Sequence, residues 1–486
     1  MKGDIVMKGN QWLGAGLGVV VLFIFLLLPP FEPITQLGMK VLGVFLFTVF
    51  WWLFVDTSFP SLLCVSLFAL LGIMTPNEVF AVALGNWIVM FLISCFGLTE
   101  AIRLSGFTHR FALWFLTRPF TAGHPWLTVV LFLFGVTLMS AVMSPTVTVI
   151  LFISLVAPML EGMGYKKGDL FPAMLIMGIG WSALAAFVAT PIGHVTNLIF
   201  IDWIRRDANF FLSFPEWLVV GVPMALLVYL LLLGFFHYIV RPDMSRFSAM
   251  TEEYIQKEAG KTTPLKTEEK FALGVFLGVV ICWMLPGVTG DILPGVSSYF
   301  DKMGFAIPPL VGTILLHLIR VRNQPLLTFR QWTTSVDWAT IALVAAIMAI
   351  GSVIGKPETG IPQFMTDILQ PVTNAPFLVV VLVSVTWVVL QTNVMSNIVS
   401  ATVVYTIIMP AVIADGVGNP IALGFTIFAG SHYAFCLPSA TTVTAIITGS
   451  GWVPVKFLAG YGALTVIPII LLLTFVCYPL ASIIFR

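Results

Sequence analysis

The sequence contains one stretch, Thr392-Asn393-Val394-Met395-Ser396-Asn397-Ile398-Val399-Ser400, in which small polar side chains interrupt an almost entirely apolar region. A weaker copy, Val142-Met143-Ser144-Pro145-Thr146-Val147-Thr148, lies upstream, and the serines of the two Val-Met-Ser triplets are 396 − 144 = 252 residues apart. In a bilayer such a run is stable only where it lines a cavity or packs against protein. Two such runs in corresponding halves of a chain predict a binding site near the middle of the membrane.

The composition around these runs is that of an integral membrane protein. The chain has 486 residues, of which 59% are hydrophobic and 9% charged, and its mean hydropathy is +1.03. Soluble domains carry roughly 25% charged residues, so this chain has too few to cover a water-facing surface. The net charge of +1 implies no attraction to nucleic acid. The five cysteines show no spacing typical of a metal site or of a disulfide framework, and we expect no cofactor.

Apolar segments long enough to cross a bilayer recur along the chain. We predict an all-α polytopic fold with about eleven transmembrane helices. They fall near residues 12–29, 36–55, 58–74, 87–104, 171–191, 216–240, 271–286, 306–320, 338–355, 421–447 and 456–483. The apolar stretches 124–163 and 376–415 are interrupted at their centres by Ser, Pro, Thr or Asn, which predicts two re-entrant hairpins.

The two halves match in order, which predicts an internal repeat. Trp87 and Trp338 open corresponding spans 251 residues apart, the Val-Met-Ser triplets are 252 apart, and Phe187–Thr196 corresponds to Phe435–Thr444 at a spacing of 248. Five predicted spans separate the starts of the two units. An odd number inverts the topology, so we expect two inverted-topology repeats.

This reading divides the chain into five parts. They are N-terminal scaffold spans (1–80), a first inverted repeat (81–240), a cytoplasmic linker with mixed charges (241–270), second scaffold spans (271–330) and a second inverted repeat (331–486). Most Lys and Arg residues fall on one side of the predicted spans. This bias predicts a cytoplasmic N-terminus and an outside C-terminus. We expect the protein to reside in a bacterial inner or plasma membrane.

Each repeat also contains a span broken at Gly or Pro, namely Thr190-Pro191-Ile192-Gly193 and Pro438-Ser439-Ala440-Thr441. Broken helices expose carbonyl groups that suit a small cation, whereas half-helix N-termini and hydroxyl groups suit an anion. The pattern therefore predicts two pseudo-symmetric cation sites beside one shared anion site.

The hairpin tips, the Thr190–Gly193 break with Asn197 beyond it, and the Trp-led spans resemble the divalent anion/sodium symporter family, which includes sodium-coupled dicarboxylate, citrate and sulfate carriers. The resemblance covers roughly residues 35–480. It implies an elevator-type homodimer whose protomers have eleven spans and two re-entrant hairpins. It also implies that tip residues bind sodium and the carboxylates of the substrate.

The candidate site follows from the tips, the breaks and this resemblance. For substrate binding we select Ser144, Thr146, His194, Thr196, Asn197, Ser396, Asn397, Ser439, Thr441 and Thr442. For Na⁺, the expected coupling ion, we select Ser140, Ser144, Gly193, Thr392, Asn393, Asn397 and Ala440.

The tips depart from the Ser-Asn-Thr pattern of the family. Pro145 stands in place of Asn and Ile398 in place of Thr. Pro145 supplies neither a side-chain amide nor a backbone N–H. His194 lies between Gly193 and Asn197, where it could replace lost donors.

The leading hypothesis is a secondary active transporter that carries a di- or tricarboxylate with Na⁺. Alternatives are a sodium-independent anion exchanger, a sulfate carrier, and a Na⁺/H⁺ antiporter of related fold, although an antiporter needs titratable acids that neither tip has. A membrane enzyme is disfavoured because the common hydrolase motifs are absent. A channel is disfavoured because broken-helix repeats occlude their ligand. The expected partners are a small anion, Na⁺, the lipid bilayer and a second copy of the chain.

Overall fold

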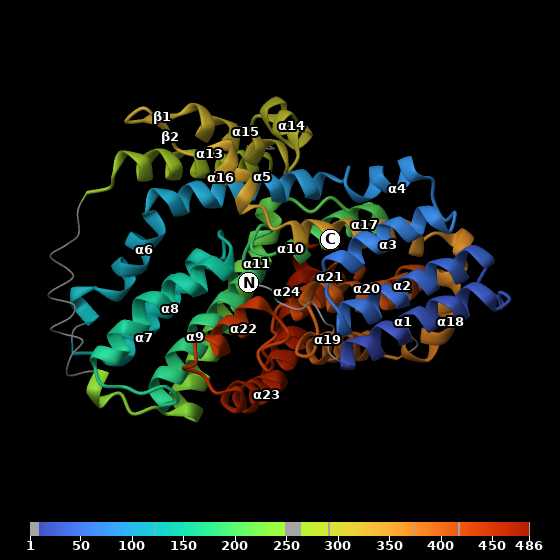
Figure 1. Cartoon of the computed structure of the whole chain (residues 1–486). Helices are drawn as coiled ribbons and strands as arrows, with labels where there is room; N and C mark the ends of the chain where they lie inside the picture. Colours follow the sequence, from blue (N-terminus) through green and yellow to red (C-terminus); the bar gives the residue numbers. More distant parts are fainter. Residues whose placement is uncertain are drawn as a thin grey trace.

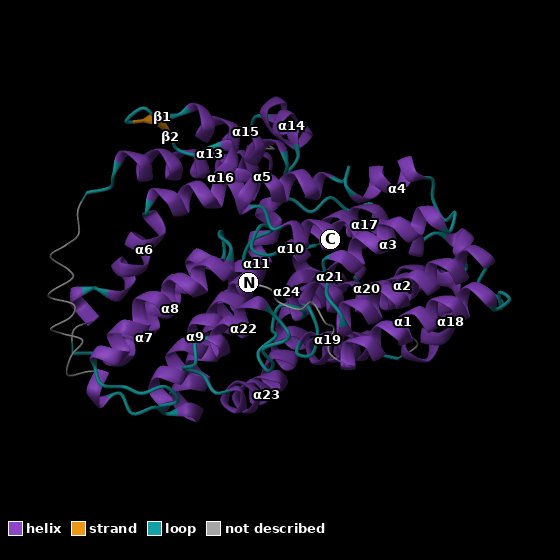
Figure 2. Cartoon of the chain, viewed as in Figure 1, coloured by secondary structure: helices purple, strands orange, loops and turns teal. Residues whose placement is uncertain are grey.

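The computed structural model describes residues 9–121, 123–247, 264–289, 292–373, 375–416 and 418–485, with the side chains of 9, 10, 119 and 371–373 excepted. These residues form helices almost throughout, and the strands among them are the short antiparallel pair β1 (Arg320–Val321) and β2 (Gln324–Pro325) (Figure 2). The middle of the predicted linker, residues 248–263, lies outside the described residues.

The first half begins with α1 (Gly9–Leu27), α2 (Gln36–Phe54), α3 (Phe59–Leu70) and α4 (Pro76–Ala83). It continues with α5 (Trp87–Ser105), α6 (Phe107–Leu116), the 3₁₀ turn η1 (Pro119–Thr121), α7 (Pro125–Ser140), α8 (Pro145–Gly162), α9 (Leu170–Ala185), the 3₁₀ turn η2 (Ala186–Val188), α10 (Val195–Ala208), α11 (Phe214–Phe235) and the π-helical turn η3 (Phe236–Val240). In Figure 1 the pair α7 and α8 lies toward one end of the molecule, and α1 and α2 lie toward the other.

The second half begins with α13 (Thr267–Thr289), α14 (Pro294–Met303), α15 (Ile307–Leu318) and α16 (Phe329–Ser335). It continues with α17 (Trp338–Ile354), η4 (Pro357–Thr359), α18 (Ile361–Thr373), α19 (Phe377–Thr392), α20 (Asn397–Asp415), α21 (Pro420–Gly430), α22 (Thr442–Gly449), α23 (Val455–Leu472), the π-helical turn η5 (Leu473–Cys477) and α24 (Tyr478–Ile484). The order from α17 to η5 repeats the order from α5 to η3, including the π-helical turn after the last long helix.

Fewer helices have full membrane-spanning length than the eleven predicted segments. Among the described residues, eight helices are long and apolar enough to cross a membrane, or nine if the bent pair α16 and α17 is one span. Several other predicted spans correspond to shorter apolar helices, such as α1, α3 and α15. The all-α polytopic class is confirmed. Some predicted spans are divided in the structure at Pro, Gly or polar residues, and hydropathy alone does not detect these divisions.

Both predicted hairpins are present as packed helix pairs. Helices α7 and α8 turn at residues 141–144, and α19 and α20 turn at residues 393–396. Pro125 and Pro145 occupy first-turn positions of α7 and α8, where the missing N–H is not needed by the helix. Ser144 and Ser396 are the residues before α8 and α20, and neither side chain caps its helix.

The two broken helices differ in extent from the prediction. Helix α9 gives way to non-helical backbone at residues 189–194, and α10 then continues to Ala208, so the predicted span 171–191 omitted α10. The predicted span 421–447 is interrupted over residues 431–441, which separate α21 from α22. The periodicity missed α10 because Asn197, Asp202 and the pair Arg205-Arg206 lower its apolar character.

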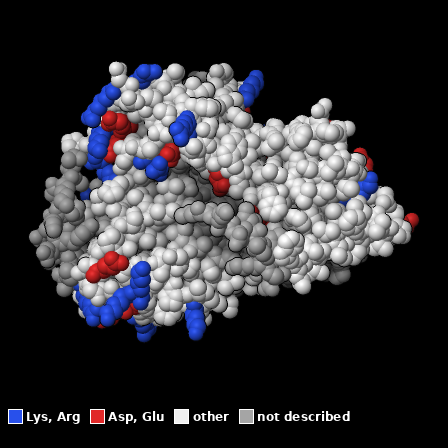
Figure 3. All heavy atoms as spheres, in the orientation of Figure 1, with Lys and Arg blue, Asp and Glu red and all other residues white. Residues whose placement is uncertain are grey.

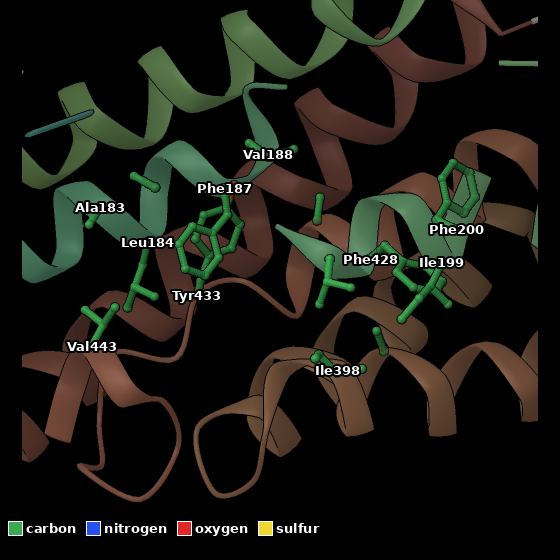
Figure 4. Close-up of a cluster of buried hydrophobic side chains, with 14 of the residues drawn as sticks. Ala183, Leu184, Phe187, Val188, Ile199, Phe200, Ile398, Phe428, Tyr433 and Val443 are labelled. Carbon is green, nitrogen blue, oxygen red and sulfur yellow. The ribbon is translucent and has the colours of Figure 1, made fainter. Parts of the chain in front are cut away.

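The core lies around these breaks. The segment Phe171–Val188 is buried throughout, whereas only 17% of the apolar window of α13 is buried. Figure 4 shows Phe187, Tyr433 and Val443 clustered beside the breaks. Helix α9 packs closely on α22, because a Cβ added at Gly180 would lie 1.9 Å from Ile447 Cδ1. The breaks are therefore held in a close-packed interior, where a polar group must find a protein partner.

The surface agrees with residence in a bilayer. Large apolar side chains such as Leu230, Ile281 and Ile467 are exposed on long helices. On the face shown in Figure 3, charged side chains gather mainly near the upper and lower edges and leave a broad uncharged zone. Exposed apolar surface of this kind is expected where helices contact the hydrocarbon core of a bilayer.

Candidate functional site

A cavity of about 460 Å³ lies where the two halves meet. Both hairpin tips and both breaks line it, and α5, α13 and α17 close its other side. The lining polar residues from the tips and breaks are Ser144, Thr146, His194, Ser396, Asn397, Ser439, Thr441 and Thr442. Residues more than 290 positions apart in the sequence thus share one wall, as in the contact between Thr146 and Thr442.

Four helices that follow the hairpin tips and the breaks begin at this cavity. The residues that precede them, Ser144 for α8, His194 for α10, Ser396 for α20 and Thr441 for α22, all line it. Each helix N-terminus carries unpaired N–H groups and roughly half a positive charge. Such a convergence suits an anion, and the described residues that line the cavity include no cationic side chain from Lys or Arg.

The charged side chains agree with this assignment. In the described part of the chain, no Lys or Arg lines the cavity, and the charged residue that does so is Asp337. The Asp337 carboxylate accepts hydrogen bonds from the backbone N–H groups of Ala339 and Thr340 at 3.1 and 3.3 Å, and from the Thr340 hydroxyl at 2.6 Å. Its charge is therefore directed into the N-terminus of α17.

The two tips present different groups to the cavity. Asn397 begins α20 and supplies both a backbone N–H and a side-chain amide, whereas Pro145 at the same position of α8 supplies neither. The Thr146 and Thr442 hydroxyl oxygens lie 3.1 Å apart and form a hydrogen bond between the first tip and the second break. The first tip thus relies on hydroxyl groups where the second has an amide.

The second break is held by the turn of its own hairpin. Asn393 Oδ1 accepts hydrogen bonds from the backbone N–H groups of Phe435 at 2.8 Å and Cys436 at 2.9 Å. Asn393 Nδ2 donates to the carbonyl groups of Val389 at 2.7 Å and Tyr433 at 3.2 Å. Thr392 donates to Asn397 Oδ1 at 3.0 Å and contacts the Ser431 carbonyl. Every polar atom of Asn393 is therefore satisfied.

The first break is held from the opposite direction, by the helix that follows it. Asn197 Nδ2 donates to the carbonyl groups of Phe187 at 2.7 Å and Thr190 at 2.9 Å. The Thr190 hydroxyl donates in turn to the Ala141 carbonyl in the turn of the first hairpin. Ala141 is the counterpart of Asn393 at the 252-residue spacing, so it has no amide with which to hold the break.

Two oxygen atoms near the first break are buried without a hydrogen-bond partner among the described residues. They are Ser140 Oγ and Asn197 Oδ1. A buried unpaired oxygen is costly, and oxygen atoms are the preferred ligands of hard cations. The chemistry of this region therefore fits a small cation.

A chain of hydrogen bonds crosses from the first break to the second. Thr196 Oγ1 lies 2.8 Å from His194 Nδ1 and 2.7 Å from His432 Nε2. The His194 ring stacks on Phe187 with centroids 4.5 Å apart, and the two imidazole centroids are 5.4 Å apart. Figure 4 shows Phe187 beside Tyr433, the neighbour of His432.

Most residues selected from the sequence meet at this site, but not all of them line the cavity. Gly193 and Ala440 also line it, whereas Ser140, Thr392 and Asn393 are buried behind the turns. Thr196 and Asn197 are fully buried behind the wall. Their side chains contact protein groups in this structure, so a direct contact with substrate stays a prediction.

Sequence reasoning missed the residues on the opposite wall and one residue in the network. The opposite wall includes Phe91, Cys95 and Thr99 of α5, and Trp283 of α13. Such residues carry no local polar signature that hydropathy could detect. His432, which lies just before the predicted second break, was not selected, because a lone histidine in an apolar segment is usually a satisfied core residue.

Comparisons with known proteins agree on one class. A family model described as a citrate transporter matches residues 42–430. A sodium-dependent dicarboxylate transporter of Staphylococcus saprophyticus is 25% identical over 98% of this chain and 93% of its own length. One from Staphylococcus aureus (strain USA300) is 22% identical over 94% of this chain and 88% of its own length.

Two further likenesses are consistent with this class. An uncharacterized transporter of Haemophilus influenzae is 23% identical over 90% of each chain. The crystal structure of the Alcanivorax borkumensis YdaH transporter matches with a TM-score of 0.54 at 12% identity and covers 98% of both chains. At that identity the likeness to YdaH concerns the fold alone.

Proposed function

Because the chain belongs to the citrate transporter family, it is a membrane transport protein and not an enzyme, and we propose that it carries a di- or tricarboxylate together with Na⁺. The family resemblance inferred from the tips and breaks is confirmed by this match. The specific substrate and the coupling ion are our proposal. They rest on the geometry of the cavity and on the printed names of the relatives.

The observation that carries the proposal is the convergence of four helix N-termini on a cavity whose lining, among the described residues, includes no Lys or Arg. Two pairs of helix starts, one pair from each half, suit a molecule with at least two separated carboxylates. Neutral donors stabilise an anion less than a buried cation would. Co-bound Na⁺ would offset the remaining negative charge, which gives a physical reason for coupling.

Sodium would bind behind the tips. In the first half, Ser140 Oγ and Asn197 Oδ1 are suited to it because they are buried oxygens without a protein partner among the described residues. In the second half, Thr392 and Asn397 would have to exchange their mutual hydrogen bond for an ion. We therefore propose that the first half takes up Na⁺ with less rearrangement.

For the transport step we propose an elevator motion of the hairpins and broken helices against α5, α13 and α17. Trp87 Nε1 on α5 donates to Asp202 Oδ1 on α10 at 2.8 Å, and the Asn86 amide lies 3.5 Å from Asp202 Oδ2. These bonds join the proposed moving and static parts, and they would break during the motion. We also propose a homodimer, which the mass of the detergent-solubilised protein would test.

We place the protein in a bacterial plasma membrane, with the N-terminus in the cytoplasm and the C-terminus outside. The distribution of Lys and Arg supports this orientation. Labelling of single cysteines introduced near each terminus, with a reagent that does not cross the membrane, tests it. Reaction of the N-terminal cysteine in intact cells would reverse the assignment.

Thermal unfolding of the purified protein with succinate, citrate and sulfate, each in Na⁺ or in choline, tests the substrate and the ion. A ligand that binds only the folded state raises the free energy of unfolding by RT ln(1 + [L]/Kd). We expect stabilisation by a carboxylate that requires Na⁺. Stabilisation by citrate or succinate that is equal in choline would instead support a sodium-independent exchanger, which the absence of an amide at Pro145 favours.

The variant Asn397→Ala tests the location of the site. Asn397 lines the cavity and is 3% exposed, so its removal deletes a donor from the second tip. We expect uptake to be lost while the protein remains folded. Normal uptake by this variant would place substrate binding away from the tip.

A further inference from the structure

The hydrogen-bond chain His194–Thr196–His432 joins the cavity to a buried group of the other half. His194 lines the cavity, Thr196 and His432 are fully buried, and Thr196 and His432 are 236 residues apart in the sequence. His432 follows α21, whereas His194 precedes α10. Both hydrogen bonds of this chain, at 2.8 and 2.7 Å, lie within the usual range.

The positions of the protons in this chain follow from the donors around it. The backbone N–H of Thr196 donates to His194 Nδ1 at 3.3 Å. A backbone N–H cannot accept a hydrogen bond, so Nδ1 of the neutral imidazole carries a lone pair and the ring proton lies on Nε2. The Thr196 hydroxyl, also within hydrogen-bond distance of Nδ1, must then donate to it.

The same reasoning fixes His432. The single hydroxyl proton of Thr196 is used toward His194, so Thr196 Oγ1 has only lone pairs to offer His432. His432 Nε2 must therefore carry the proton and donate, which leaves a lone pair on Nδ1. His432 Nδ1 is indeed buried with no partner among the described residues, as expected of an atom that has no proton to place.

We propose that His432 is a positioning residue for the substrate site, which acts through Thr196 to hold His194 in the tautomer that presents an Nε2–H donor to a substrate carboxylate. The proposal rests on the proposed carboxylate transport. In this tautomer the cavity-lining His194 offers a donor and no acceptor. The site should thus favour a carboxylate oxygen over an amide group, whose N–H₂ would require an acceptor.

The test compares the binding of succinate with that of its monoamide, succinamate, to the full-length protein in Na⁺. The variants are His432→Ala, His432→Gln and Thr196→Val, with Tyr433→Phe as the matched control, because the buried Tyr433 hydroxyl has no partner among the described residues. We expect His432→Ala and Thr196→Val to weaken succinate binding by about two- to tenfold, the effect of one neutral hydrogen bond. Their preference for succinate over succinamate should shrink by a similar factor.

Rescue and coupling separate positioning from general loss of packing. His432→Gln retains an amide donor and should recover much of the preference, and Tyr433→Phe should leave it unchanged. In a His194→Ala background, His432→Ala should have no further effect on the preference. An undiminished effect in that background, or an equal effect of Tyr433→Phe, would overturn the proposal.

A readout without substrate keeps this inference separate from the proposed function. Nitrogen-15 spectra of labelled histidine distinguish the two neutral tautomers of His194. We expect the Nε2–H form in the wild-type protein and a mixture in Thr196→Val and His432→Ala. Succinate binding to the wild-type protein tests the proposed carboxylate substrate alone. An Nδ1–H form of His194 in the wild-type spectrum would overturn the positioning role, whatever the substrate.

Discussion

The two broken helices have the same place in their repeats but are held in opposite ways. The break at residues 431–441 is long, and Asn393 holds it from the preceding hairpin turn with three hydrogen bonds. The break at residues 189–194 is short, and Asn197 holds it from the following helix with two. The Asn393 side chain has no unpaired polar atom, whereas Asn197 Oδ1 and the nearby Ser140 Oγ have no partner among the described residues.

This difference shows that a repeat can keep its backbone path while its amide groups exchange places. The first hairpin has Ala141 and Pro145 where the second has Asn393 and Asn397, so it lacks both side-chain amides. Asn197 on α10 supplies an amide to the first break from another direction. Asn393 uses its whole amide to hold the second break and its hairpin, whereas Asn197 Oδ1 stays unpaired among the described residues and suits an ion. The halves should therefore respond differently to equivalent substitutions.

The largest effect is expected for Asn393→Ala. The backbone N–H groups of Phe435 and Cys436 would lose their acceptor inside the protein, at a cost of about 1–3 kcal/mol each. We expect a marked fall in the midpoint of thermal unfolding and loss of uptake. Asn393→Asp, which keeps Oδ1 as the acceptor for both N–H groups but loses the Nδ2 donor to Val389 and Tyr433, is the comparison. An unchanged midpoint for Asn393→Ala would show that the second break holds itself.

A smaller loss of stability is expected for Asn197→Ala. Its side chain donates only to carbonyl groups, and an under-satisfied carbonyl is tolerated better than an orphaned N–H. We expect destabilisation of about 1–2 kcal/mol together with a clear loss of stabilisation by Na⁺, measured by thermal unfolding in NaCl and in choline chloride. Retained Na⁺ stabilisation would move the ion away from this oxygen.

The difference between the tips can be reduced with Pro145→Asn. The change restores a backbone N–H and an amide to the start of α8, at little cost to the helix because this position is its first. We expect Na⁺-dependent succinate affinity to rise about two- to tenfold, as for one added hydrogen bond. Weaker binding would indicate that the first tip is adapted to proline.

The smallest effect is expected for the hydrogen bond between the halves. Thr146→Val and Thr442→Val each remove one partner of a partly solvated contact at 3.1 Å. We expect each to reduce the free energy of succinate binding by about 0.5–1.5 kcal/mol. The double variant should lose less than the sum of the two, and strict additivity would show that this bond does not form in the bound state.

The sequence allowed much of the site to be predicted, because polar residues are rare in its apolar segments. Ser144, Ser396 and Asn397 were found at the tips, and Thr441 and His194 at the breaks, and all of them line one cavity. Thr196 and Asn197 lie in the predicted region, but their side chains are buried behind the cavity wall. Whether a polar side chain faces the cavity or the protein depends on the rotation of its helix, which local pattern does not give.

The sequence by itself determined that this is a membrane protein, and it determined the positions of the hairpin turns and of the helix breaks. These properties are local, because each depends on hydropathy or on Pro, Gly and polar residues within a few positions. Only the tertiary structure decided that Asn393 and Asn197 hold the breaks from opposite sides, that Asp202 meets Trp87, and that His432 reaches His194 through Thr196. These pairings join distant segments, and packing alone sets which atoms meet.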